Sequence, residues 1–129
     1  MKNNRRYGLI GSKLQHSFSP KYFKNKFEKE NILDAYYGIY EMDDLSEVFV
    51  LIENGILGLN VTMPYKEKVI PLLDHLEGDA LAIKSVNTIK IEQGKLVGYN
   101  TDTYGFRESI RPLISKAKSN KALILGTGG

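Results

Sequence analysis

The chain has 129 residues, 42% of them hydrophobic and 26% charged, which is typical of one domain with a core of its own. Its 18 basic and 15 acidic residues are interspersed, so the net charge of +3 does not indicate a nucleic-acid-binding arm. The absence of cysteine excludes disulfides and thiolate metal sites, and His16 and His75 lack the spacing of zinc ligands.

The apolar segments are short. No run approaches the roughly 18 apolar residues of a membrane span, and the basic N-terminus lacks the apolar stretch of a signal peptide. We therefore expect a soluble, cytoplasmic protein that binds neither membranes nor nucleic acids.

The first half of the chain alternates between apolar runs and amphipathic segments, and predicts strands over residues 7–11, 34–40 and 57–61. Ser19 and Pro20 are expected to open a helix, with Ser19 as its cap and Pro20 at the first helical position. Phe23 and Phe27, four residues apart, would form its inner face and its lysines the solvated face. A second helix is expected over 43–54, because acidic residues occupy its first turn and Gly55 follows its end.

The second half predicts a short helix after Pro64, a helix over 76–84, and a hairpin of residues 86–91 and 95–99 around Gln93-Gly94. A helical period begins at Asp102, and Pro112 should kink or split it. Residues 121–125 read as one more buried strand. Strands alternating with helices predict an α/β fold of three layers, an open mixed, mostly parallel sheet flanked by helices.

The last residues, KALILGTGG, predict a strand that runs into Gly126, Gly128 and Gly129, as a dinucleotide-binding βαβ unit begins. The helix and second strand of such a unit do not follow, so we expect a chain that stops at the start of a truncated Rossmann domain. The expected boundaries are 1–101 for the first domain, 102–118 for a connecting helix and 119–129 for the start of the second domain.

Polar residues gather where predicted strands give way to helices. Taken one at a time, each is explained as a helix cap or a solvated surface residue, and Lys66 is expected in the first turn of a helix, where a cation opposes the helix dipole. Together they form a set of hydroxyls, amides, a lysine and a carboxylate, which suits a small ligand with a carboxylate and several hydroxyls. The set comprises Ser17, Ser19, Asn60, Thr62, Lys66, Asn87 and Asp102.

Several motifs resemble those of the shikimate dehydrogenase family: YGLIG with SFSP, NVTMPYK, SVNTI, GYNTD and LILGTGG, in the family's order. The resemblance implies a mixed α/β substrate domain joined to a Rossmann-type NADP domain. It also implies reversible reduction of 3-dehydroshikimate to shikimate with NADPH, in aromatic amino-acid biosynthesis. We expect the complete enzyme to be active and this chain alone to be inactive.

The resemblance also implies roles for individual residues. Ser17 and Ser19 would bind the substrate carboxylate, and Lys66 and Asp102 would be the catalytic pair. Ring hydroxyls would be bound by Asn60, Thr62, Asn87 and Asp102, and the pyrophosphate loop would begin with Gly126, Gly128 and Gly129. No metal is implied. The chain departs from the family at Phe23-Lys24, where His-Asn is usual, and at Lys84-Ser85, where Gly-Ala is usual.

Three alternatives remain at this point. The enzyme could accept quinate, it could be a folate or amino-acid dehydrogenase of similar plan, or the chain could be a non-catalytic ligand-binding or interaction module. An exposed apolar strand can pair with another chain. Residues 119–129 are therefore expected to be disordered, folded back onto the domain, or paired with a second molecule in a homodimer.

Overall fold

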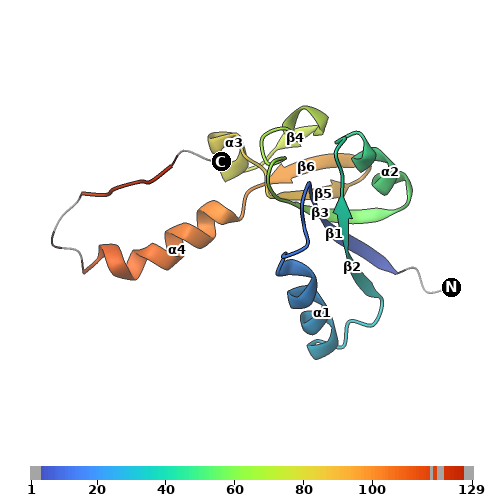
Figure 1. The fold of residues 1–129 in the computed structure, drawn as a ribbon, viewed down its shortest axis with the longest axis horizontal. Coiled ribbons are helices and arrows are strands. Elements are labelled where there is room, and N and C mark those ends of the chain that lie inside the picture. Colours follow the sequence, from blue (N-terminus) through green and yellow to red (C-terminus); the bar gives the residue numbers. More distant parts are fainter. Residues whose placement is uncertain (1–3, 117, 119–120, 127–129) are drawn as a thin grey trace.

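The computed structural model describes residues 4–116, 118 and 121–126. Within them, six strands form one sheet in the order β2-β1-β3-β5-β6-β4 (Figure 1). The strands are β1 (Arg5–Gly11), β2 (Ala35–Glu41), β3 (Ile56–Val61), β4 (His75–Leu76), β5 (Thr88–Glu92) and β6 (Lys95–Tyr99). The helices are α1 (Ser19–Lys29), α2 (Glu47–Glu53), α3 (Asp79–Ile83) and α4 (Asp102–Ile114), with a 3₁₀ turn, η1 (Ile70–Leu72).

Strand direction in this sheet is mostly parallel. β1 pairs in parallel with β2 and β3, and β4 pairs in parallel with β6. β5 is antiparallel to both of its neighbours, β3 and β6. The predicted mixed, mostly parallel sheet is therefore confirmed. One consequence is that β1, β2, β3 and β6 all end at the edge of the sheet where β5 begins.

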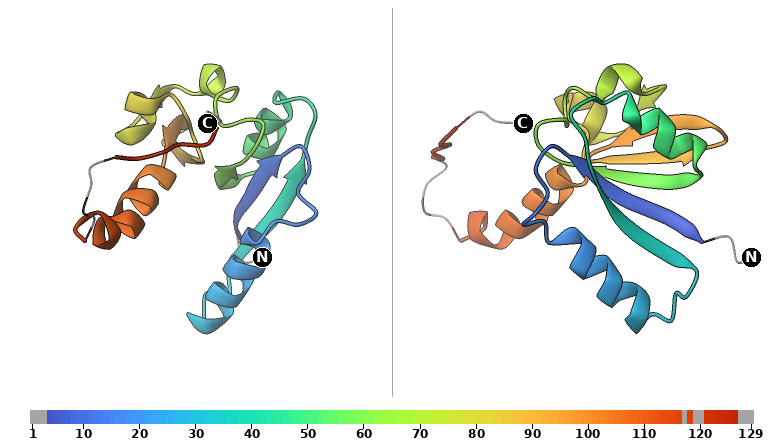
Figure 2. Two further views of the ribbon diagram at one scale, coloured as in Figure 1. Left: turned by 60° about the vertical axis from the view of Figure 1, so that its left-hand side comes forward. Right: turned by 45° about the vertical axis from the view of Figure 1, so that its right-hand side comes forward.

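Helices cover both faces of the sheet. Tyr37 of β2 stacks on Phe23 of α1, with ring centroids 4.3 Å apart. Tyr40, three residues further along β2, packs in the main core cluster, which includes Val48 of α2. Because successive side chains of a strand point to opposite faces, α1 and α2 lie on opposite sides of the sheet (Figure 2). The core cluster is mostly aliphatic and joins the strands to α2, α3 and the segment after β3, through Ile10, Val48, Leu59, Val69, Ala80 and Ile89.

Two helices start away from the predicted residue, α1 by one residue and α2 by four. Ser19 is the first helical residue and Phe18 is the cap, because Phe18 already has helical backbone angles, and no side chain caps this end within the described residues. α2 starts at Glu47 instead of residue 43. The Asp44 carboxylate accepts a hydrogen bond from the Ser46 N–H at 2.8 Å, which makes a turn ahead of the helix. The end of α2 agrees with prediction, since Gly55 follows it with φ +80°.

The segment after β3 also differs from expectation. In the described structure, turns follow Pro64 and the first helical piece is η1, so Lys66 lies in a turn and not in the first turn of a helix. Lys66 therefore does not oppose a helix dipole, contrary to expectation. The helix expected over 76–84 is shorter, because residues 75–76 pair with β6 as β4 and leave only residues 79–83 for α3.

The hairpin and the last helix agree better with the sequence. β5 and β6 join at Gln93 and Gly94, both with positive φ, as a tight hairpin turn requires. α4 is not split at Pro112 and continues to Ile114. None of its residues, all of which are described, is buried.

Residues 121–125 do not form the expected strand: in the described structure they lie outside helix and sheet, and Leu123, Ile124 and Leu125 are 83–89% exposed. A strand needs a hydrogen-bonding neighbour, and no described strand lies beside this segment. Gly128 and Gly129 lie outside the described residues. No helix in the described part of the chain has the length and apolar character needed to cross a membrane.

Candidate functional site

The polar residues singled out from the sequence come from one edge of the sheet. Ser17 and Ser19 follow β1, Asn60 and Thr62 lie at the end of β3, and Lys66 comes shortly afterwards. Asn87 immediately precedes β5, and Asp102 follows β6. Because β5 alone among the described strands runs in the opposite direction, its beginning lies beside the ends of β3 and β6. The topology therefore gathers segments from the whole chain at this edge.

The Lys66 ammonium and the Asp102 carboxylate form an ion pair at this edge. The Lys66 Nζ lies 2.6 Å from the Asp102 Oδ2. The Lys66 side chain is 25% exposed and that of Asp102 57%, so a ligand can reach both groups from solvent. Charge-assisted hydrogen bonds of this length are stronger than those between neutral groups. The Asp102 carboxylate can therefore hold the Lys66 ammonium in an orientation suited to proton transfer.

A hydrogen-bonded chain lies next to this pair. The Tyr37 hydroxyl donates to the Asn60 Oδ1 at 2.7 Å, and the Asn60 Nδ2 donates to the Thr88 Oγ1 at 3.2 Å. The Thr88 hydroxyl donates to the Asn87 Oδ1 at 3.0 Å, which extends the chain to Asn87. The Asn87 Nδ2 donates to the Thr101 Oγ1 at 2.7 Å, and its Oδ1 also accepts from the Thr101 N–H at 2.9 Å. Asn87 therefore joins the start of β5 to the end of β6, which accounts for an amide where a strand residue would otherwise be expected.

Tyr37 is a neutral hydrogen-bond donor in this chain. Burial raises the pKa of Tyr37 to about 12, and a hydrogen bond with Ser19 works in the opposite direction by lowering it. Ser19 therefore meets β2 through Tyr37, which links the start of α1 to Asn60.

Two cavities open at or near this edge. One, of about 720 Å³, is lined by residues that include Tyr37, Asn60, Thr88, Tyr99 and Thr101. The other, of about 640 Å³, is lined by Lys13, Leu14, Gln15, His16, Ser17, Glu41 and Thr62. Of the predicted site residues, Asn60 lines the first cavity, and Ser17 and Thr62 line the second. The other four, Ser19, Lys66, Asn87 and Asp102, line neither of them.

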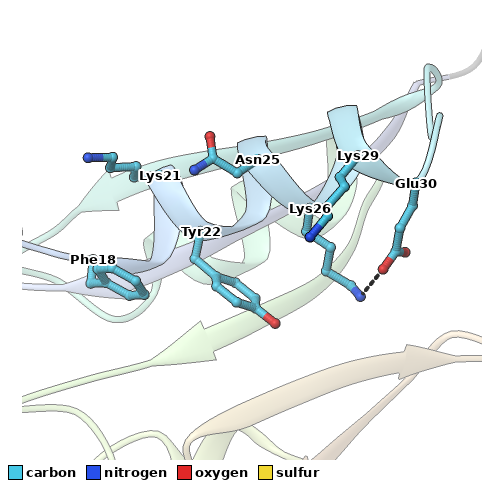
Figure 3. A pocket seen from close by; sticks show the side chains of 7 residues that line it. All are labelled: Phe18, Lys21, Tyr22, Asn25, Lys26, Lys29 and Glu30. Atoms are coloured by element: carbon cyan, nitrogen blue, oxygen red, sulfur yellow. Dashed lines mark hydrogen bonds and ion pairs between the residues drawn. The ribbon is translucent and has the colours of Figure 1, made fainter.

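A third hollow lies along α1 and is distinct from this edge. Its volume is about 350 Å³, and the lining residues form one stripe of the helix, with an ion pair of 2.6 Å between Lys26 and Glu30 (Figure 3). The helix lysines at 21, 24 and 29 are exposed, in line with the solvated face that the sequence predicts. Within the described residues, no group of three or more histidine, aspartate and glutamate side chains could hold a metal ion.

Comparison with known proteins decides the family. A family model described as the shikimate dehydrogenase substrate binding domain matches residues 9–89. This chain belongs to that family. The matched segment contains Ser17, Ser19, Lys66 and Asn87, together with Asn60 and Thr62.

Individual relatives agree with this result. The NADP(+) shikimate dehydrogenase of Aquifex aeolicus is 43% identical over 126 residues, which cover 95% of this chain and 46% of that protein. A solved chorismate mutase/shikimate 5-dehydrogenase fusion protein from Clostridium acetobutylicum superposes with a TM-score of 0.85 at 36% identity, over 98% of this chain and 47% of that one. A quinate dehydrogenase from Corynebacterium glutamicum, solved with NAD, gives 0.78 at 30% identity, over 89% and 44%. The chain spans about half the length of these relatives.

Of the glycines expected to begin a cofactor loop, only Gly126 belongs to the part of the chain that the structure describes. Gly126 has φ +103°, which suits a glycine turn, but it follows the exposed, non-strand residues 121–125. A dinucleotide phosphate is bound where a strand turns into a helix N-terminus. The described residues 121–126 therefore do not fit an NADP phosphate site.

Three residues at the edge were missed by sequence reasoning. Tyr37 sits on the α1 face of β2, Thr101 bonds to Asn87, and the Glu41 carboxylate accepts from the Leu14 N–H at 2.7 Å beside Ser17. Thr101 lies between Asn100 and Asp102 in the GYNTD motif, so this motif could have indicated a role for it. Tyr37 and Glu41 carry no local signal, because only the parallel pairing of β1 and β2 places them at the site.

Proposed function

We propose that this chain is the substrate-binding part of an NADP-dependent oxidoreductase that reversibly reduces 3-dehydroshikimate to shikimate, a step of aromatic amino-acid biosynthesis. The observation that supports it most directly is the 2.6 Å pair of Lys66 and Asp102 at the sheet edge where the other polar residues gather. Membership of the family and the likeness to NADP(+) shikimate dehydrogenases support the substrate and the cofactor.

Lys66 would move the proton in this reaction. Reduction of a ring ketone to an alcohol requires a proton on the oxygen, and an ammonium within hydrogen-bond reach of that oxygen can donate it. In the reverse direction the neutral amine takes the proton back. Asp102 orients the ammonium through its carboxylate and leaves the other N–H groups of Lys66 free to face the substrate oxygen.

The substrate carboxylate would bind at the start of α1. The first N–H groups of a helix are not used within it, and the helix dipole favours an anion at this end. Ser17 and Ser19 flank this end, and both hydroxyls are partly exposed. Asn60 and Thr62 would bind ring hydroxyls, as would Asp102 and the second amide N–H of Asn87, for which the described residues provide no acceptor.

Quinate is the second candidate substrate. The likeness to the Corynebacterium glutamicum quinate dehydrogenase favours it. That protein is 30% identical in sequence to this chain, whereas the Aquifex aeolicus shikimate dehydrogenase is 43% identical. Both compounds carry a carboxylate and ring hydroxyls, so they would share most contacts. Comparing kcat/KM for the two in the complete dehydrogenase separates the candidates.

The test of the proposed roles is steady-state kinetics of single variants in the complete dehydrogenase that contains this chain. Lys66→Ala should lower kcat on the order of 10²–10⁴-fold, because it removes a proton donor. Ser17→Ala should mainly raise KM, because its contact is with a carboxylate that does not react. Lys68→Ala is the matched control, since Lys68 is an exposed lysine two residues further on. Near-normal turnover by the Lys66→Ala enzyme would refute the assignment.

A further inference from the structure

Both members of the Lys66–Asp102 pair are attached to the same two buried residues. The Val86 N–H donates to the Lys66 carbonyl at 2.8 Å, which holds the Lys66 backbone. The adjacent carbonyl, that of Ser85, accepts a hydrogen bond from the Asn100 Nδ2 at 2.9 Å. Ser85 and Val86 are only 6% and 0% exposed, so this attachment point is buried.

Asn100 connects Ser85 to Asp102. Its Oδ1 accepts from the Asp102 N–H at 2.9 Å and from the Thr103 N–H at 3.2 Å, so it caps α4 from the residue before the N-cap. Thr101, the N-cap itself, makes no side-chain cap bond in the described structure. The Asn100 amide therefore accepts hydrogen bonds from the first turn of α4 through its oxygen and donates one to the Ser85 carbonyl through its nitrogen.

Packing contributes little to the direction of α4, because none of its described residues is buried. Polar contacts therefore matter more at this helix. Besides the Lys66–Asp102 pair, the Arg107 guanidinium reaches Asp79 of α3, but at 3.4 Å and with both side chains exposed. An exposed pair of that kind contributes little. The Asn100 bridge is shorter and partly buried, and it acts at the residue that carries the carboxylate.

We propose that Asn100 is a positioning residue that holds the Asp102 carboxylate against Lys66 by bridging Ser85 and the first turn of α4. The proposal rests on the proposed roles of Lys66 and Asp102. The bridge needs an acceptor and a donor on one planar group, which asparagine provides. Aspartate supplies the acceptor only, and its second oxygen would face the Ser85 carbonyl. Asn100→Asp therefore keeps the helix cap and breaks the bridge, which separates capping from positioning.

The first experiment needs no substrate and uses the 129-residue chain. The side-chain ammonium signal of ¹⁵N-labelled Lys66 is followed by NMR, and Asp102→Asn gives the signal of a broken pair. The Asn100→Asp signal should move from the wild-type position toward that reference, while the α4 backbone amides keep helical shifts. Asn100→Ser, which retains a capping hydroxyl but is too short to reach Ser85, should behave in the same way and serves if Asn100→Asp does not fold.

Asn54→Ala is the matched control. The Asn54 Nδ2 also donates to a backbone carbonyl, that of Val50 at 2.8 Å, at the exposed end of α2. It should leave the Lys66 signal unchanged. A Lys66 signal that coincides with wild type in both Asn100 variants would overturn the proposal, as would an Asp102→Asn signal equal to wild type.

The second experiment uses the complete dehydrogenase. Asn100→Asp should lower kcat about three- to tenfold, as expected for the loss of one or two hydrogen bonds, and should raise KM for shikimate by a smaller factor, because Asp102 would also bind a ring hydroxyl. A raised KM with unchanged kcat would contradict a positioning role. If the enzyme does not turn over shikimate but the ammonium signal responds to Asn100→Asp, the proposed function fails and the positioning of Asp102 by Asn100 stands.

Discussion

The Lys66 ammonium and the Asp102 carboxylate are 2.6 Å apart although 36 positions separate them in the sequence. The fold explains their approach. β3 and β6 run in the same direction on either side of the antiparallel β5, so the segments that leave them emerge at one edge. Lys66 follows β3 and Asp102 follows β6, and the pair forms where these two segments meet.

The 129-residue chain alone should not catalyse hydride transfer. Residues 121–126 are exposed and do not form the strand and turn that hold a dinucleotide phosphate. Purified chain mixed with NADP and shikimate should produce reduced nicotinamide, followed by absorbance, at the rate of a Lys66→Ala chain. A rate clearly above that background would show that the chain binds the cofactor in a way that its described residues do not indicate.

Tyr37 should make the fold less stable at alkaline pH. Burial raises the pKa of Tyr37 to about 12 in the folded chain, from an ordinary value of 10.0. Between these two pH values the unfolded chain loses the Tyr37 proton while the folded chain keeps it. The folded state then binds more protons, so the free energy of unfolding falls as pH rises through this window.

Chemical denaturation of wild type and Tyr37→Phe, at about pH 9 and about pH 11, measures this effect. Tyr37→Phe should lose less stability over the interval, because the other titrating groups are common to both proteins. It also loses the bond to Asn60, so it should be the less stable of the two at the lower pH. Equal losses in the two proteins over the interval would contradict the role of Tyr37.

Lys84 should be a position where glycine stabilises the fold. Lys84 ends α3 in the left-handed conformation, with φ 54° and ψ 44°, and its side chain is exposed. A Cβ atom is unfavourable in that conformation and glycine avoids the penalty. After allowance for the greater freedom of glycine in the unfolded chain, Lys84→Gly should raise the free energy of unfolding by about 0.5–1 kcal/mol.

Urea denaturation of Lys84→Gly and Lys84→Ala tests this prediction. The alanine variant removes the same charge but keeps the Cβ atom, so it should be no more stable than wild type. A glycine variant no more stable than the alanine variant would mean that the backbone at Lys84 carries no strain.

Local patterns predicted those parts of the fold that depend on local physics. The hairpin followed from Gln93-Gly94, because few dipeptides accept two successive positive φ angles. The apolar runs that became β1 and β3 were recognisable because strands buried in a parallel sheet are nearly continuous in apolar residues. The pairing of Lys66 with Asp102 followed from the family motifs and from the placement of both residues after predicted strands.

Long-range contacts decided what the sequence did not reveal. Ser19 looked like a cap, but Phe18 already adopts helical angles, and Ser19 instead lowers the pKa of Tyr37 on β2. The KALIL segment has strand composition without a strand beside it in the described structure. Lys66 was expected at a helix start, whereas a turn holds it through the Val86 N–H. For Ser19 and Lys66 the partner is distant in the sequence, and for KALIL the neighbouring strand is missing, so no local pattern encodes these outcomes.

The central claim, that this chain binds shikimate at the edge where Lys66 meets Asp102, is tested most directly by a shikimate titration followed by amide NMR. Saturable shifts should appear at Ser17, Thr62, Asn87 and Asp102. Gln93-Gly94, at the opposite edge of the sheet, should not move, and acetate at equal concentration should affect at most the residues near Ser17. Saturable shifts confined to the site would support the account. No shifts at saturating shikimate, or shifts centred on the hairpin turn, would contradict it.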